Sequence, residues 1–423
     1  MFRRCCFAMV AVVCFGAGGS GRPARAQEVL SLKEALAEAL AKNPEVQTLE
    51  RRLEAAAARA RQAPYLEDPE IAFQLGGVPF SHPTSLDRAD ANLIGIRQKL
   101  PFFGKLGLKE KIAQQDVKVA AQELRAKRRE IIARVKTAYA ELFMARKSAE
   151  ILREQLEIIR TVIRATEARY QVGRAAQQDV LKALVEQSEL TNQLILAEES
   201  GSAAAVALNT LMYRPPTEPI QLPPDLEVPN GAASLADLTE LALVNRPELK
   251  GAEEGVERGE KLYELAQRNR KFPDFMVGWD YMRMPTEMNK ERYTAMINIT
   301  IPFSPWTMGK RNFEVEEALA EIRAARANRD AMRNMTLREL GESRAKVQAA
   351  RRSLQLYKEG LLSQAELSFR AALAAYQTGR VEFVALLEAQ RALREARMGY
   401  YKATVGLVQS LAELERVVGT DLE

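Results

Sequence analysis

The sequence predicts a mainly α-helical protein with a small β part, built as an internal two-fold repeat. Two long helical runs without proline and two pairs of alternating segments predict the α and β parts. Paired landmarks in unchanged order, 201 to 206 residues apart, predict the repeat, whose period is too long for a solenoid. The pairs are Asn43-Pro44-Glu45 with Arg246-Pro247-Glu248, Asp68-Pro69-Glu70-Ile71 with Phe272-Pro273-Asp274-Phe275, Leu100-Pro101-Phe102 with Ile301-Pro302-Phe303, Gly104-Lys105 with Gly309-Lys310, and "YQVGR" at 170–174 with "YQTGR" at 376–380.

The first 26 residues have the layout of a cleavable signal peptide. Arg3-Arg4 precede an apolar run over 5–17, and Ala24-Arg25-Ala26 provides a small-residue cleavage site. An N-terminal membrane anchor is the alternative, but the run is too short to span about 30 Å of hydrocarbon. Lipid attachment at Cys14 is a second alternative, although Val13 precedes it where a small residue would be expected. We therefore expect the segment 1–26 to be removed on secretion.

The expected mature chain has few residues suited to catalysis or metal binding. All three cysteines, Cys5, Cys6 and Cys14, lie in the signal segment, which excludes disulfides, thiolate metal sites and cysteine catalysis. His82 is the only histidine. Removing the four arginines of the signal segment takes the formal charge from +5 to +1, and the remaining charges of both signs are interleaved, so nucleic acid is not supported as a partner. We expect no enzymatic activity and no cofactor.

Each repeat begins with a predicted amphipathic helix. Ser31 is a good N-cap residue, and Glu34 stands at the capping-box position three residues later. In the second repeat Ser234 and Asp237 stand in the same relation. A Pro-rich linker separates the two copies. The predicted organisation is a first repeat, the linker and a second repeat, at 27–213, 214–233 and 234–423.

Each repeat then carries a predicted strand hairpin, near 70–100 in the first and 274–302 in the second. The alternation is strongest over 275–281 and 293–301, where one face is aromatic and aliphatic and the other polar. Packing of the apolar face against another sheet in a soluble sandwich is one interpretation. An outer-membrane barrel with that face toward lipid is the other. Four strands cannot close a barrel, because about eight are the minimum, so a barrel would require several chains.

Very long helical runs follow each hairpin, at 105–172 and 310–378. A run of this length would extend about 100 Å. Each ends at a repeated glycine, Gly173 or Gly379, which predicts a left-handed C-cap and a reversal into a returning helix. Alanine-rich helices of this kind pack side by side in water with coiled-coil geometry. A periplasmic or filamentous coiled coil has the same helical pattern, so the hairpins are what favours a channel.

Taken together, these features resemble the TolC-like outer-membrane efflux proteins, and among them the heavy-metal (CusC/CzcC-like) branch. The most specific points are the duplication, the two Y-Q-x-G turns followed by leucine-rich runs, and the junction Leu100-Pro101-Phe102-Phe103-Gly104-Lys105. The resemblance covers essentially the whole expected mature chain. It implies a homotrimer with a shared 12-stranded β-barrel in the outer membrane and a long antiparallel α-helical barrel across the periplasm. The implied partners are outer-membrane lipid, a periplasmic adaptor protein and an inner-membrane transporter of RND type.

The resemblance also implies site residues. The turns where adaptors dock correspond to Val172, Gly173, Arg174, Thr378, Gly379 and Arg380. The closed periplasmic constriction corresponds to Tyr170, Asp179, Tyr376 and Glu388. The second copy departs from the family pattern, because Ala385 stands where the family has an aspartate. We therefore expect an acidic constriction with a different arrangement, although carboxylates that merely solvate the helices are the alternative.

The polar side of the hairpins supplies further candidates. We expect the following residues to face the channel lumen: Met276, Asp280, Met282, Met284, Met296 and Asn298. Methionine sulfur suits Cu(I), but methionine also fills space in protein cores, so no metal site is assigned from the sequence. The expected function is export of heavy-metal cations through an outer-membrane channel. The alternatives are the same channel serving organic compounds, and a periplasmic coiled-coil adaptor or scaffold.

Overall fold

The computed structural model describes residues 29–78, 80–81, 83–173, 175–228, 235–285, 287–288 and 290–422. The predicted signal peptide, His82, Arg174 and Ser234 lie outside these ranges. The first repeat contains α1 (Leu32–Lys42), α2 (Pro44–Gln62), β1 (Glu70–Gly76), the short 3₁₀ helix η1 (Leu86–Arg88), β2 (Ala91–Leu100), α3 (Lys105–Gln171) and α4 (Gln177–Leu211). The second contains α5 (Leu235–Asn245), α6 (Pro247–Lys271), β3 (Asp274–Met284), β4 (Lys290–Thr300), α7 (Pro305–Leu356), the π-helical turn η2 (Tyr357–Leu361), α8 (Leu362–Gln377) and α9 (Phe383–Val418).

The predicted start of the first repeat is correct. The Ser31 hydroxyl accepts from the Glu34 backbone N–H, and the Glu34 carboxylate accepts from the Ser31 N–H, which completes the capping box of α1. Asn43 then caps α2 by accepting from the Glu45 N–H at 2.9 Å. In the second repeat a buried Arg246 takes the place of Asn43 at the start of α6 and pairs with Glu339 at 2.8 Å. The repeat is therefore preserved in backbone more closely than in side-chain chemistry.

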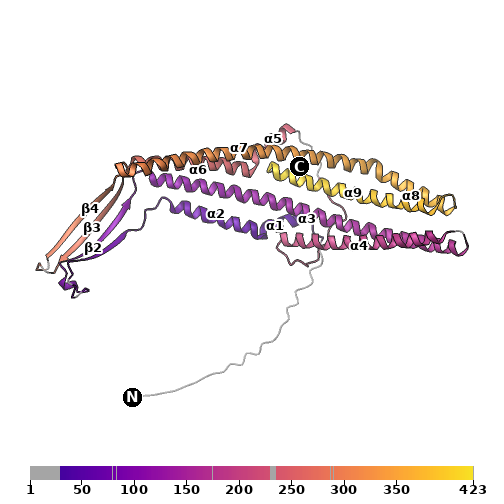
Figure 1. Ribbon diagram of the computed structural model, residues 1–423, viewed down its shortest axis with the longest axis horizontal. Helices are drawn as coiled ribbons and strands as arrows, with labels where there is room; N and C mark the ends of the chain where they lie inside the picture. The colour runs from indigo at the N-terminus through magenta and orange to yellow at the C-terminus, as the bar shows by residue number, and fades with distance from the viewer. Residues whose placement is uncertain are drawn as a thin grey trace, which may run out of the picture.

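The four strands form one antiparallel sheet in the order β1-β2-β3-β4. The sequence predicts two hairpins, and the structure joins them through β2 and β3, with Leu100 opposite Phe275 and Gln98 opposite Val277. The sheet is a single layer that projects from one end of the helices (Figure 1). Among the described residues, the outer strands β1 and β4 each have a partner strand on one side only.

The long helices run side by side away from the sheet and end in two reversals at the far end of the molecule (Figure 1). α3 spans 67 residues without interruption, as predicted. The prediction of one continuous helix over 310–378 was wrong in two respects. α7 begins at Pro305, in the first turn, where proline's missing N–H costs no hydrogen bond. It also widens into the π turn η2, where the Leu362 N–H bonds to the carbonyl of Tyr357 five residues back.

A buried lysine joins the two repeats at the junction of sheet and helices. Lys105 Nζ donates to Asp274 Oδ1 at 2.8 Å and to the Phe272 carbonyl at 3.0 Å. The ring of Phe102 stacks on that of Phe272 with centroids 4.5 Å apart. Gly104 reaches the left-handed conformation, φ 82°, that the start of α3 requires.

The match of Gly104-Lys105 with Gly309-Lys310 does not extend to the structure. Gly309 lies inside α7 with no positive φ, and Lys310 is 77% exposed. The extra residues before Gly309 are taken up by the earlier start of α7. The buried junction lysine is therefore specific to the first repeat.

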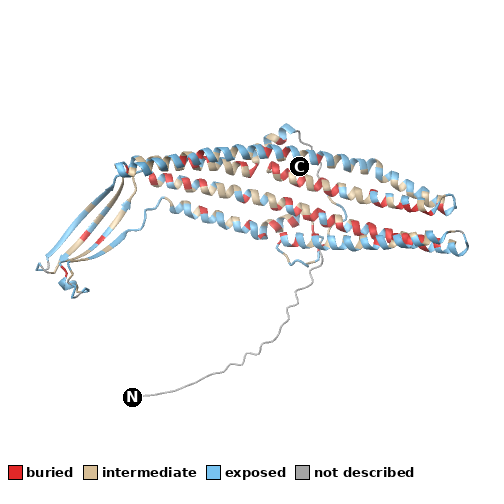
Figure 2. Ribbon diagram, viewed as in Figure 1, coloured by how far each residue is buried: buried red, intermediate tan, exposed pale blue. Residues whose placement is uncertain are grey.

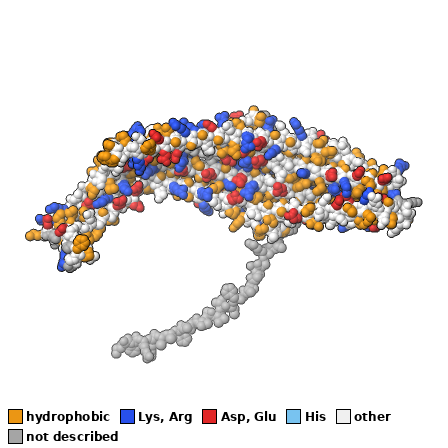
Figure 3. All heavy atoms as spheres, in the orientation of Figure 1, with side chains coloured by type: hydrophobic (Ala, Val, Ile, Leu, Met, Phe, Trp, Pro, Cys, Tyr) orange, Lys and Arg blue, Asp and Glu red, His pale blue; other side chains and the backbone are white. Residues whose placement is uncertain are grey.

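Buried residues concentrate along the facing sides of the helices, in the middle of the molecule and toward the turns (Figure 2). Two of the core clusters each lie within one repeat, and two others are shared between the repeats. The sheet is mostly exposed in a single chain (Figure 2). Basic and acidic side chains intermingle along the helices (Figure 3). In the face drawn in Figure 3, hydrophobic side chains also reach the surface over the sheet and near the turns. A single chain therefore leaves apolar surface uncovered at both ends.

Candidate functional site

The two repeated glycines form the turns at the far end of the helices. Gly173 and Gly379 adopt φ values of 72° and 74°, and their N–H groups bond to the carbonyls of Tyr170 and Tyr376. A Cβ on Gly173 would meet nothing within 4 Å, so the requirement for glycine there is conformational rather than steric. Of the residues expected to dock the adaptor, Val172 and Thr378 directly precede the two glycines, and Arg380 follows Gly379. Arg174 lies outside the described residues.

The two repeated tyrosines have different surroundings. Tyr376 is buried, its hydroxyl is 3.3 Å from the Thr166 hydroxyl, and the Arg169 guanidinium lies 4.7 Å from the centre of its ring. Arg169 also donates to the Tyr376 carbonyl at 3.1 Å. Tyr170, by contrast, is exposed. Tyr376 therefore holds the two repeats together at this end, whereas Tyr170 is open to a neighbour.

The two predicted acidic positions lie near the starts of the returning helices. Asp179 is in the first turn of α4 and is half-buried, and Glu388 is on α9 and exposed. A carboxylate in the first turn of a helix is favoured by the helix dipole, which applies to Asp179 more than to Glu388.

A buried ion-pair cluster close to these positions was not predicted. Glu186 of α4 is almost fully buried and accepts from Arg391 Nε and Arg394 Nη1 of α9, each at 2.8 Å. Burial alone would raise the pKa of Glu186, but the hydrogen bonds from the two arginines outweigh it and hold that pKa below its ordinary value. The residues are more than 200 positions apart in sequence, and each reads as an ordinary solvated helix charge. No local signal identifies the cluster.

Further polar contacts join the repeats along the same stretch. Gln390 Nε2 donates to Gln155 Oε1 at 3.0 Å, with both side chains buried. We call the contacts Thr166/Arg169–Tyr376, Glu186–Arg391/Arg394 and Gln155–Gln390 the inter-repeat latch. Buried polar pairs in a helical bundle hold one register more strictly than apolar ones, because any shift leaves them unsatisfied. The latch therefore fixes the relative position of the two helical hairpins.

The π turn η2 packs against a glycine of α9. A Cβ on Gly399 would lie 2.5 Å from atoms of the Tyr357 ring, so only glycine leaves room for that ring. π turns often mark functional or flexible points in helices. η2 stands between α7 and α8 in the chain.

The predicted lumen-facing residues share one face of the sheet. The register places Met276 opposite Asn298 and Lys99, and Asp280 opposite Thr294 and Gly95. The alternation of strand side chains puts Met282, Met284 and Met296 on this same polar face. Asp280 is only 3% exposed because its carboxylate lies over Gly95, where a Cβ would be 1.8 Å from Oδ1.

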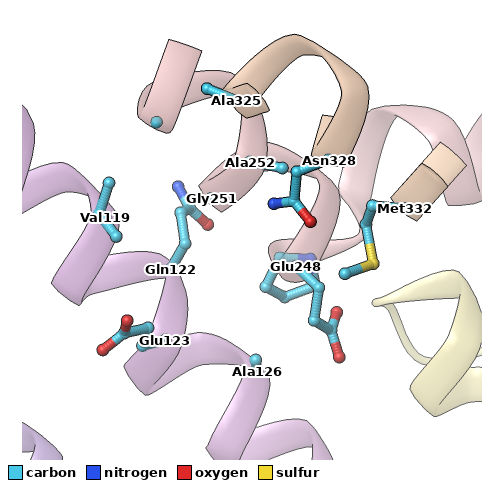
Figure 4. A pocket seen from close by; sticks show the side chains of 12 residues that line it. Val119, Gln122, Glu123, Ala126, Glu248, Gly251, Ala252, Ala325, Asn328 and Met332 are labelled. Carbon is cyan, nitrogen blue, oxygen red and sulfur yellow. The ribbon is translucent and has the colours of Figure 1, made fainter. Parts of the chain in front are cut away.

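A pocket of about 300 Å³ lies between α3, α6 and α7 (Figure 4). Small residues form much of its wall, and polar side chains at its edge include Gln122, Glu123, Glu248 and Asn328. In the part of the chain that the structure describes, no three His, Cys, Asp or Glu side chains gather as a metal-binding group. The pocket is best explained as space left between the helices where their facing residues are glycine and alanine, whose side chains are too small to fill it.

None of the helices in the described ranges combines the length and the hydropathy that crossing a membrane requires.

Comparison with known proteins gives one curated relative. The cobalt-zinc-cadmium resistance protein CzcC of Cupriavidus metallidurans is 26% identical over 257 residues. The match covers 60% of this chain and 60% of CzcC, so it spans about three fifths of the length of that relative.

Solved structures match over nearly the whole chain. The outer-membrane protein VceC of Vibrio cholerae is 20% identical, with a TM-score of 0.77 over 93% of this chain and 97% of VceC. CusC is 16% identical, with a TM-score of 0.76 over 92% of both chains. The outer-membrane channel OprN is 18% identical, with a TM-score of 0.77 over 92% of this chain and 90% of OprN. At these identities the matches establish the fold, which is that of TolC-like channels.

The family comparison covers both repeats. A family model described as outer membrane efflux protein matches residues 35–212 and 238–420, on either side of the Pro-rich linker. These stretches include the long helical pairs, the glycine turns and all four strands. The chain therefore belongs to the outer membrane efflux protein family.

Proposed function

We propose that the protein is the outer-membrane channel of a tripartite efflux system. Three copies would close a 12-stranded β-barrel from their sheets and a long antiparallel α-helical barrel from their helices. The helical end would meet a periplasmic adaptor and, through it, an inner-membrane transporter of RND type. The cargo would be heavy-metal cations.

The family and the fold are those of efflux channels rather than of enzymes, and the family places the chain in the outer membrane of a Gram-negative cell. The family match favours a channel over the alternative function of a periplasmic adaptor or scaffold. Beyond the family match, we propose the trimeric assembly, the partner proteins and the cargo.

The observation that carries the proposal is a single-layer sheet with two open edges and a bare apolar face. β1 and β4 have no strand beyond them in the described chain. Ile71, Phe73, Ile297 and Ile299 lie on the apolar face and are all exposed. Open edges are not tolerated in lipid, and a bare apolar face is not stable in water. Pairing β4 of each copy with β1 of the next removes the edges, and lipid covers the face.

The internal repeat predicts the register in which β4 of one copy pairs with β1 of the next; we call this pairing the seam. Within the chain Gln98 of β2 stands opposite Val277 of β3. The repeat equates Gln98 with Ile299, and Val277 with Phe73. Ile299 of β4 should therefore stand opposite Phe73 of the partner subunit.

Cysteine cross-linking tests the seam. In a chain whose three native cysteines, all within the first 14 residues, are removed, the pair Ile299→Cys and Phe73→Cys should form disulfide-linked oligomers up to a trimer. The pair Ile297→Cys and Phe73→Cys, displaced by two residues, is the matched control and should link poorly. A folded monomer in mild detergent, measured by native mass spectrometry, would rule out the barrel.

We propose further that the glycine turns form the adaptor-docking end and that Asp179 and Glu388 form acidic rings inside its mouth. They lie six residues past Gly173 and nine past Gly379, as the third residue of α4 and the sixth residue of α9. Such rings attract cations and repel anions. Single-channel recording tests them: Asp179→Asn with Glu388→Gln should reduce cation selectivity and block by multivalent cations. Unchanged selectivity would identify these carboxylates as solvating groups only.

The heavy-metal cargo is supported by the likeness to CzcC, whose name refers to cobalt, zinc and cadmium. Organic compounds are the competing cargo, since the fold is shared with OprN and VceC at equal TM-score. A strain that lacks the gene and the same strain with the gene restored are grown on cobalt, zinc, cadmium, copper and silver salts, and on dyes and detergents. Comparing their growth distinguishes a metal cargo from an organic one. Sensitivity confined to organic compounds would refute a metal cargo.

A further inference from the structure

Two methionine sulfurs from neighbouring strands meet at one amide group on the polar face of the sheet. Asn298 Nδ2 lies 3.3 Å from Met296 Sδ and 3.9 Å from Met276 Sδ. The amide N–H groups donate to the sulfurs, so lone pairs of both thioethers are directed at a common point. That point already carries a partial positive charge.

The ordinary role of methionine does not explain this pair. Methionine usually fills gaps in a packed core. In the described part of the chain, the sheet is a single layer that no helix covers (Figure 1). Met276 and Met296 are partly exposed, and their cross-strand neighbours include Lys99 and Asn298 rather than core residues. There is no core on this face for the two side chains to fill.

We propose that Met276 and Met296 bind a soft monovalent cation, Cu(I) or Ag(I), on the lumen face of the barrel. Thioethers select soft cations, whereas Zn²⁺ and Co²⁺ are better bound by imidazole, thiolate or carboxylate groups. Asn298 is the third ligand, because rotation of its amide presents Oδ1 at the point that Nδ2 now occupies. The inference rests on the proposed function, since it places the site on the exit path and names the class of cargo.

Charged groups of both signs lie around the pair. Lys99, opposite Met276, lies 3.5 Å from both Glu67 and Glu70. The Arg97 stem covers Gly278, 3.2 Å from where a Cβ would be. Asp280 Oδ1, buried on the same face, has no hydrogen-bond partner among the described residues and adds negative charge. With neutral ligands, binding depends on sulfur–metal bonds rather than on charge, so it should change little between about pH 5 and pH 7.

Silver binding to the purified full-length channel in detergent tests the site. Equilibrium dialysis in chloride-free buffer should show about one tightly bound Ag(I) per chain, as expected for a thioether site. Met276→Leu with Met296→Leu preserves side-chain volume but removes both sulfur ligands. Loss of an outer-shell partner lowers metal affinity about 10–100-fold, and loss of the two ligands should lower silver affinity by more than that. Met308→Leu with Met335→Leu removes two exposed methionines of α7 and should leave binding unchanged. Zn²⁺ should not compete.

Equal silver binding by the wild type and the Met276/Met296 variant would overturn the inference, as would equal loss in the α7 control. Trimer formation of each variant, measured by native mass spectrometry, shows that the variants are assembled. The proposed function is tested separately by metal resistance in cells. Export without a role for the two methionines refutes only the site. Silver binding without export refutes only the proposed function.

Discussion

Glu186 of α4 and Arg394 of α9 form a buried ion pair that joins the two repeats near their turns. Arg394 Nη1 donates to Glu186 Oε1 at 2.8 Å, and the two side chains are 9% and 1% exposed. Arg391 binds the second carboxylate oxygen. The helical hairpins cannot separate at this end without leaving three charges unpaired. In the channel proposed above, the pair would help to hold this end of the helices closed.

Removal of the Glu186 charge should loosen the latch. Glu186→Gln leaves Arg394 buried without a counter-ion, and breaking a buried pair in this way costs about 3–5 kcal/mol. We expect a lower denaturant midpoint and a larger or more frequent open conductance in planar bilayers. Circular dichroism and single-channel recording measure the two effects.

The matched control is Glu189→Gln. Glu189 is exposed and lies 3.5 Å from the same Arg391, and an exposed pair contributes about 0–1 kcal/mol. It should leave both the midpoint and the conductance near the wild-type values. Wild-type conductance in Glu186→Gln would show that the pair has no part in closing the channel.

The latch should also depend on pH in a defined direction. The pKa of Glu186 is lowered in the folded protein, so its pairing stabilises the fold above the pKa of the unfolded chain and is lost as pH falls through the folded value. The difference in stability between wild type and Glu186→Gln should be constant from pH 7 to about pH 5, and should shrink below about pH 4.3, the ordinary glutamate value. Denaturant titrations at several pH values measure it. A difference that grows on acidification would contradict the assignment.

Gly399 should be required by the Tyr357 ring. Gly399→Ala places a methyl group 2.5 Å from the ring atoms, and overpacking of this kind costs about 1–3 kcal/mol. Gly406→Ala, on the same helix with nothing within 4 Å of the added Cβ, is the control and should be neutral or stabilising. Tyr357→Ala combined with Gly399→Ala should recover part of the loss. If the stability changes of the two single variants simply add in the double variant, the added methyl group does not clash with the Tyr357 ring.

The turn glycines should tolerate asparagine better than valine. Gly173 and Gly379 have φ values near 70°, where a β-branched residue is strained and asparagine is accepted more readily. Gly173→Val with Gly379→Val should abolish cellular resistance to the exported compounds, although the protein should still reach the outer membrane. Gly173→Asn with Gly379→Asn should retain most of that resistance. Growth assays and membrane fractionation provide the measurements. Full resistance in the valine variant would refute a docking role for the turns.

The local features of this protein could be predicted from its sequence. The capping box at Ser31, the alternation over Phe275–Tyr281 and the left-handed turns at Gly173 and Gly379 follow from residues within a few positions of one another. Each depends on short-range hydrogen bonds or backbone sterics, which a sequence pattern records directly. The shared polar face of Met276 and Asn298 follows in the same way from the two-residue period of strands.

Which of these parts meet could not be predicted from the sequence, because it depends on long-range packing. Whether the two hairpins join through β2 and β3, and whether Glu186 meets Arg394 rather than water, depends on packing between segments about 200 residues apart. The burial of Lys105 but not Lys310, and the π turn at Tyr357 beside Gly399, also break the symmetry of the repeat. Two nearly identical local sequences can differ in this way, because burial and pairing are properties of the neighbours that the fold supplies. The repeated order of helices and strands is therefore legible in local sequence patterns, whereas the differences between the two copies arise from long-range packing.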